Sequence, residues 1–98
     1  MEIVCNAFSL QMVDRDNWSK IRVIPIGAPS AERLKAAQSA VGHADTAAVL
    51  GVACNRINVK LKEGDVLLVA QLTGGRLPEG ATTLPEGFSF SWAKVFIR

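Results

Sequence analysis

Residues 66–70, Val-Leu-Leu-Val-Ala, constrain the fold more than any other stretch, because none of them is polar. A short apolar run of this kind predicts a strand inside a sheet, buried on both of its faces. The run stops at Gln71, and a glycine-rich loop over residues 73–76 is expected to follow it. We therefore expect a sheet in which residues 66–70 form a central strand.

Four further segments are expected to be strands: residues 2–8, 20–26, 57–61 and 88–97. They are rich in β-branched and aromatic residues, and the segment 57–61 alternates apolar with polar side chains. Pro25 has no backbone N–H to donate, so the segment 20–26 is expected at an edge of the sheet or to stop pairing there.

Two segments are expected to be helices, residues 31–40 and about 44–53. Ser30 is a good N-cap for the first, and Glu32 lies in its first turn, where the helix dipole favours an acidic residue. Gly42 is expected to end this helix, and His43 to begin the next. The pattern predicts a single α/β domain over residues 1–98, with about five strands and two main helices.

The composition agrees with a globular protein of one domain. The chain has 98 residues, of which 49% are hydrophobic and 20% charged. Its formal net charge of +2 is too weak to support bulk binding of DNA or RNA. A small anionic ligand, held by a few well-placed cations, remains compatible with this charge.

The cysteines and the single histidine exclude several other classes. Cys5 and Cys54 lie far apart and without metal-like spacing, so we expect reduced thiols, no metal site and no cofactor. The N-terminal residues lack the basic and long apolar regions of a signal peptide. No apolar run is long enough to cross a membrane, and a cytoplasmic location is expected.

His43 is the only histidine in the chain, and it follows a flexible glycine and precedes a helix. The first N–H groups of a helix lack internal partners and attract anions, phosphate above all. Because imidazole groups titrate near neutral pH, a histidine beside such an anion is half of a phosphodiester-cleaving centre. The alternative is that His43 only caps the helix or lies on the surface.

Other polar residues fall at the expected strand ends or in the loops beside them: Asn6, Ser9, Arg56, Gln71, Arg76 and Glu79. Ligands of α/β proteins gather beyond strand ends, and this set would suit an anionic polar ligand. Each residue also has an ordinary explanation: arginines form surface ion pairs, Asn6 and Ser9 form turns, and Glu79 lies in an exposed turn. The pattern alone leaves both interpretations open.

Several motifs occur in a fixed order: Asn6-Ala7-Phe8-Ser9, Gly42-His43-Ala44-Asp45-Thr46, Asn55-Arg56, residues 60–65, Gln71, and residues 76–80. In this order the chain resembles the small viral and bacterial ring nucleases that act as anti-CRISPR proteins against type III systems. The resemblance covers nearly the whole chain. Its most specific parts are the first two motifs taken together.

The resemblance implies a homodimer with a mixed sheet that binds cyclic tetra-adenylate across the dimer. Such proteins open this second messenger without metal, to linear di-adenylate with a 2′,3′-cyclic phosphate, and a ribose 2′-hydroxyl of the substrate is the nucleophile. The resemblance makes His43 the general acid on the leaving 5′-oxygen and gives Glu79 a part in activity. It assigns ligand contacts to Asn6, Ser9, Arg56, Gln71 and Arg76.

Gly74-Gly75 before Arg76, and the short connection over residues 51–54, depart from the pattern of that family. Both departures could alter the mobility of loops over the site. Two other functions stay open. One is a non-catalytic dimer that sequesters a cyclic nucleotide or docks on a host protein, and the other is a small DNA- or RNA-binding dimer, against which the weak net charge argues.

Overall fold

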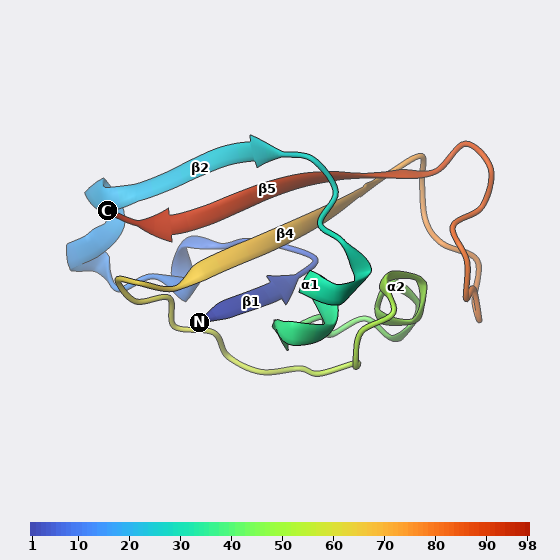
Figure 1. Ribbon diagram of the computed structural model, residues 1–98, viewed down its shortest axis with the longest axis horizontal. Helices are drawn as coiled ribbons and strands as arrows, with labels where there is room; N and C mark the ends of the chain where they lie inside the picture. The colour runs from blue at the N-terminus through green and yellow to red at the C-terminus, as the bar shows by residue number, and fades with distance from the viewer.

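Five strands form one mixed sheet in the computed structural model, which describes residues 1–98 (Figure 1). The strands are β1 (Glu2–Cys5), β2 (Ile21–Ile26), β3 (Gln38–Ser39), β4 (Val66–Thr73) and β5 (Ser89–Ile97), and their order is β2-β5-β4-β1-β3. β5 is antiparallel to both β2 and β4, whereas β1 is parallel to β4 and to β3. The predicted α/β class with a five-stranded mixed sheet is confirmed.

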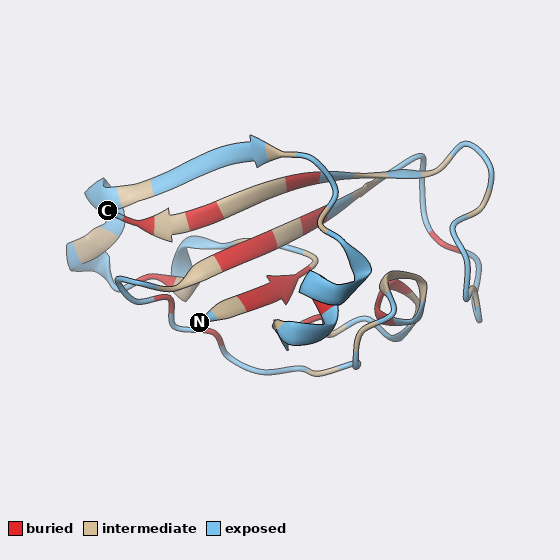
Figure 2. Cartoon of the chain, in the orientation of Figure 1, coloured by how far each residue is buried: buried red, intermediate tan, exposed pale blue.

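β4 is the central strand, as predicted. Leu67 and Leu68 are both fully buried, and because neighbouring side chains of a strand point to opposite faces, β4 is covered on both sides (Figure 2). β4 extends beyond the predicted end at Ala70 and pairs with β5 as far as Thr73. Gln71 is therefore a residue of the strand, opposite Ser91, rather than a residue of the exit loop.

Two short helices cover one face of the sheet. They are α1 (Ala31–Ala36) and α2 (Ala44–Leu50), and Leu34 of α1 and Ala47 of α2 are buried. The core on this face comprises Val4, Leu34, Val41, Ala47, Leu68, Ala70 and Trp92. Both predicted helices exist, but both are shorter than expected.

The chain after α1 corrects the prediction of a helix as far as residue 40. α1 starts as expected, with the Ser30 hydroxyl accepting a hydrogen bond from the Arg33 N–H at 3.1 Å, but it ends at Ala36. Gln38 and Ser39 then pair with β1, and the Ala40 N–H donates to the Val4 carbonyl at 2.7 Å. Pairing with a strand distant in sequence has overridden a local helix preference.

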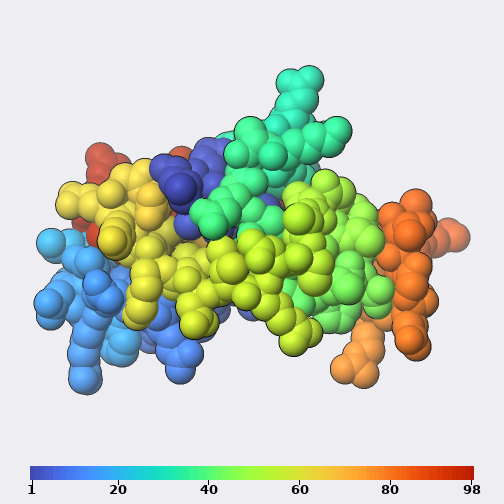
Figure 3. Space-filling view, turned by 90° about the horizontal axis from the view of Figure 1, so that it is seen from below, coloured from blue at the N-terminus to red at the C-terminus, as the bar shows by residue number.

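Irregular chain covers the other face of the sheet. It consists of two 3₁₀ segments, η1 (Leu10–Met12) and η2 (Arg15–Lys20), and of the extended chain after α2, which runs across the front of the molecule in Figure 3 (yellow-green). The core on this face comprises Ile3, Cys5, Val13, Val59, Leu61, Leu67, Val95 and Ile97.

The predicted strand 57–61 is wrong, although its apolar side chains are placed as expected. Val59 and Leu61 are buried, but the backbone makes only an isolated bridge, between Leu61 and Val13. The position beside β1 is already occupied by β3, so this alternating segment packs its apolar side chains on the face of the sheet instead of joining its edge. Pro25, by contrast, lies on β2 at an edge of the sheet, as predicted.

Residues 74–88 connect β4 to β5 and extend past one end of the sheet (Figures 1 and 3). This connection contains Arg76 and Glu79, and α2 is the helix nearest to it in Figure 1. None of the helices is both long enough and apolar enough to cross a membrane.

Candidate functional site

His43 lies immediately before α2 and caps it with its own side chain. The imidazole Nδ1 accepts a hydrogen bond from the Thr46 backbone N–H at 3.3 Å and lies 3.2 Å from the Thr46 hydroxyl oxygen. The His43 carbonyl accepts from the Ala47 N–H at 2.9 Å. One of the first-turn donors that were expected to hold an anion, the Thr46 N–H, is thus bound by His43 itself.

The cap leaves the other ring nitrogen of His43 free for a ligand. Because Nδ1 accepts from a backbone N–H, the neutral ring carries its proton on Nε2. His43 is exposed, and Nε2 has no hydrogen-bond partner in the protein. The neutral ring caps the helix through Nδ1, whereas the charged ring, with a proton on each nitrogen, would turn Nδ1–H to the Thr46 hydroxyl and could donate from Nε2.

A hollow of about 430 Å³, the central hollow, joins His43 to other predicted site residues. Asn6 follows β1, and Arg56 follows α2 by six residues, yet both line this hollow with His43. Asn58 adds a second amide. The apolar part of the lining consists of Ala7, Met12, Ala40, Gly42 and Ile57.

Two more hollows share lining residues with the central one, and we call the three adjoining hollows the groove. The first, of about 330 Å³, shares Asn6 and Ala7 and contains Gln71. The second, of about 320 Å³, shares Met12, Ile57 and Asn58 and contains Ser9. The fold thus brings five of the predicted residues, Asn6, Ser9, His43, Arg56 and Gln71, to the walls of one groove.

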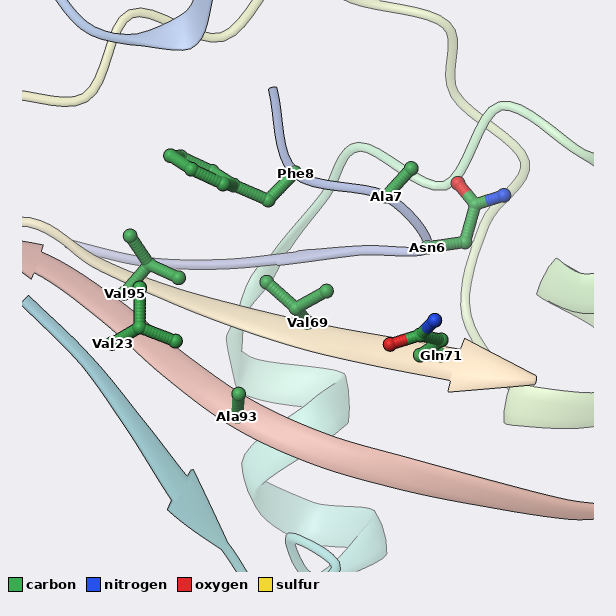
Figure 4. Close-up of a pocket in the computed structure, with 8 residues that line it drawn as sticks. All are labelled: Asn6, Ala7, Phe8, Val23, Val69, Gln71, Ala93 and Val95. Carbon is green, nitrogen blue, oxygen red and sulfur yellow. The ribbon is translucent and has the colours of Figure 1, made fainter. Parts of the chain in front are cut away.

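The hollow that contains Gln71 has an apolar body and a polar end (Figure 4). Phe8 lies opposite the sheet, where Val69, Ala93 and Val95 form the floor. The amides of Asn6, which directly follows β1, and of Gln71 in β4 lie at the same end of the hollow. A flat apolar group would fit between Phe8 and the sheet, and the amides could bind polar atoms on its edge.

Arg76 and Glu79 line none of these hollows. Both are exposed residues of the connection between β4 and β5 and form no ion pair. One hydrogen bond holds this connection to α2: the Gly80 N–H donates to the Asp45 carboxylate at 3.2 Å. The contact brings the residue after Glu79 against the first turn of the helix that His43 caps.

Sequence reasoning missed Asn58 and the apolar lining of the groove. Asn58 is a polar residue of a segment that alternates apolar with polar side chains. Because Val59 is buried, its neighbour Asn58 points the other way, and the alternation could have predicted this. Ala7 and Phe8 belong to the motif Asn6-Ala7-Phe8-Ser9, but the sequence assigned ligand contacts only to Asn6 and Ser9. Ala7 also receives a hydrogen bond from the Cys5 thiol at 3.2 Å, and burial raises the pKa of this thiol to about 11.

Comparison with known families matches residues 3–89 to the model described as STIV B116-like. The chain belongs to the STIV B116-like family. Among solved structures, B116 of Sulfolobus turreted icosahedral virus is similar, with a TM-score of 0.69, 23% identity and coverage of 97% of each chain. Comparison with curated proteins gives no match. The STIV B116-like match includes every predicted site residue, and the structural likeness extends the common fold to almost the whole chain.

Proposed function

We propose that this protein is a metal-independent ring nuclease that opens cyclic tetra-adenylate to linear di-adenylate with a 2′,3′-cyclic phosphate. Its effect would be to switch off type III CRISPR defence in the cytoplasm of the cell that makes this messenger. The observation that carries the proposal is that His43, with Nε2 free, lines one hollow with Arg56 and Asn6. The order of motifs along the chain supports it, as does membership of a family named after a viral protein.

In the proposed reaction, two phosphodiester bonds of the ring are cleaved, which releases two molecules of di-adenylate. In each cleavage, a ribose 2′-hydroxyl of the ring attacks the adjacent phosphorus while the bond from phosphorus to the 5′-oxygen breaks. The Arg56 guanidinium neutralises the phosphate, because its N–H groups match phosphate oxygens in geometry and charge. The charged imidazolium of His43 donates its Nε2 proton to the leaving 5′-oxygen and becomes neutral, a step that typically contributes about 10²–10⁴-fold. No metal is needed, because the substrate supplies its own nucleophile.

Glu79 and Arg76 enter the proposal through the connection between β4 and β5. Its hydrogen bond to Asp45 holds this connection beside α2, and a rearrangement of the connection would be needed to bring Glu79 and Arg76 to a bound ring. Glu79 would take the proton of the 2′-hydroxyl or orient that group, and Arg76 would contact a phosphate. Asn6, Ser9 and Gln71 would bind the nucleosides along the groove.

The partner that we propose for this chain is a second copy of itself. A ring of four identical nucleotides has a symmetry that includes a two-fold axis, so a two-fold dimer can offer each residue of the groove twice. Each protomer would then hold half of the ring. Sedimentation or light scattering should accordingly show a dimer, with one cyclic tetra-adenylate per dimer.

The decisive experiment is incubation of the native protein with cyclic tetra-adenylate in EDTA, with identification of the products. We expect linear di-adenylate with a 2′,3′-cyclic phosphate from the native protein. His43→Ala should bind the ring but lose about 10²–10⁴-fold in cleavage rate. Intact ring after long incubation with the folded native protein would reject the catalytic proposal.

A matched variant separates the chemistry of His43 from its capping role. Asparagine is a favoured N-cap and cannot donate an acidic proton, so His43→Asn should keep the melting temperature of the native protein. It should cleave as slowly as His43→Ala. A His43→Asn variant that cleaves at the native rate would show that His43 is not the general acid.

The cap itself favours a second candidate function. Because His43 already has a structural role, the groove could serve a non-catalytic dimer that sequesters a cyclic nucleotide or docks on a host protein. Calorimetry that shows tight binding of cyclic tetra-adenylate, without any product, would favour this alternative.

A further inference from the structure

We propose that Gly42 is a positioning residue that holds the Arg56 guanidinium ready for a phosphate. This inference rests on the proposed function only for the identity of the ligand, a phosphate of cyclic tetra-adenylate. Gly42 comes directly before His43, and both line the central hollow with Arg56. The role of Gly42 follows from the close contact that any side chain at this position would make with Arg56.

The Arg56 side chain lies against the place where a Cβ of residue 42 would be. An ideal Cβ built on Gly42 would lie 2.8 Å from Arg56 Cγ, and 3.7 Å from both Arg56 Cβ and Cδ. Any residue other than glycine would therefore push the arginine side chain out of this course. The backbone of Gly42 does not explain the glycine, because it is outside the left-handed region.

The Gly42 carbonyl also binds the arginine that passes over it. Arg56 Nε donates a hydrogen bond to this carbonyl at 2.7 Å, and Arg56 forms no ion pair with a carboxylate. One edge of the guanidinium is thus fixed on the protein, and the two terminal nitrogens keep their N–H groups for a ligand. A guanidinium held in this way loses less side-chain freedom when it binds a phosphate.

The backbone on both sides of this contact is held by several hydrogen bonds. The Asn55 N–H donates to the Val41 carbonyl at 2.8 Å, and the Asn55 amide donates to the Ser39 carbonyl at 2.9 Å. The Ser39 hydroxyl in turn donates to the Ala53 carbonyl at 2.5 Å. These bonds tie the chain before Gly42 to the chain before Arg56, so the course of the arginine is set by the fold.

The test is the substitution Gly42→Ala, with Gly27→Ala as its matched control. Gly27 is also outside the left-handed region, lines no part of the groove, and has no atom within 4 Å of an ideal Cβ. We expect Gly42→Ala to weaken binding of cyclic tetra-adenylate by roughly tenfold, the usual effect of losing a good charge-assisted hydrogen bond. Gly27→Ala should bind as the native protein does.

A double-mutant cycle shows whether the effect passes through Arg56. In an Arg56→Ala background the alanine Cβ at residue 42 has room, so Gly42→Ala should there change affinity by less than about twofold. An equal loss in both backgrounds would overturn the inference, because Gly42 would then act by another route.

A measurement without cyclic tetra-adenylate makes the inference independent of the nuclease activity. The Arg56 Nε–H resonance should be protected from exchange in the native protein and in Gly27→Ala, but not in Gly42→Ala. Titration with inorganic phosphate should shift this resonance more weakly in Gly42→Ala. Native protection in Gly42→Ala, or an unchanged response to phosphate, would reject the inference, whereas failure of the native protein to bind cyclic tetra-adenylate would reject only the proposed function.

Discussion

Thr46 is the residue through which the fold acts on the His43 ring. It is the one polar side chain among the buried residues, and its hydroxyl lies 3.2 Å from His43 Nδ1. A hydroxyl can donate to a neutral ring and accept from a protonated one. Thr46 can therefore hold the ring in one orientation before and after it gives up its proton.

The substitution Thr46→Val removes this hydroxyl and keeps the shape of the side chain. We expect cleavage of cyclic tetra-adenylate to fall about tenfold, because an unpartnered ring nitrogen costs on the order of 1–3 kcal/mol when it must carry a proton. KM should hardly change, and the dependence of kcat on pH should shift. Thr46→Ser should restore the native profile, and equal pH profiles for the Val and native proteins would contradict this role.

At the scale of single residues, the sequence predicts which polar side chains line the site better than it predicts which residues they contact. Asn6, His43 and Arg56 could be chosen because their chemistry suits a phosphate, and the structure places them at one hollow. The role that we infer for Gly42 depends on a contact with a residue 14 positions later in the chain. No local pattern reports such a contact, so Gly42 was expected only to end a helix.

At the scale of elements, the local sequence pattern predicted the secondary structure correctly where no pairing with a distant strand competed with it. The central strand and the N-cap of α1 were predicted correctly, because an unbroken apolar run marks β4 and the Ser30 side chain caps an N–H only three residues later. Two predictions, that of a helix as far as residue 40 and that of a strand at 57–61, were wrong for the same reason. β3 occupies the edge beside β1, which shortens α1 and denies that edge to the later segment.

The connection between β4 and β5 depends on one hydrogen bond for its contact with α2, from the Gly80 N–H to the Asp45 carboxylate. Asp45→Ala should remove this contact and raise the hydrogen-exchange rate of the Gly80 amide by roughly two- to tenfold, as expected for an exposed bond worth about 0.5–1.5 kcal/mol. Asp45→Asn keeps an acceptor oxygen and should retain most of the protection. Native exchange at Gly80 in Asp45→Ala would show that this contact does not hold the connection.

At the scale of the whole molecule, the two faces of the sheet are stabilised differently. Helices cover one face, whereas irregular chain covers the other, where Cys5 is buried beside Leu67. The chain that leaves Cys5 becomes the wall of the groove, and the Cys5 thiol donates to the Ala7 carbonyl within that wall. The hydrogen bond of the Cys5 thiol therefore connects the core of this face to the wall of the groove.

Cys5 should make the protein less stable at alkaline pH. Burial raises the pKa of its thiol from 9.0 to about 11, so above pH 9 the unfolded chain loses this proton before the folded protein does. The unfolded state then binds fewer protons, and the free energy of unfolding falls as pH rises from about 9 to about 11. At about 1.4 kcal/mol for each pKa unit, the loss is on the order of 2–3 kcal/mol.

Denaturant unfolding at several pH values between 8 and 11 measures this loss. Lysines also titrate in this range, so the quantity of interest is the difference between the native protein and Cys5→Ala. Cys5→Ala should be less stable at pH 8, because it leaves a cavity in the core, but its free energy of unfolding should fall less steeply with pH. Cys54 is exposed, so Cys54→Ala should keep the native slope. Parallel curves for the native protein and Cys5→Ala would mean that the buried thiol does not couple folding to pH.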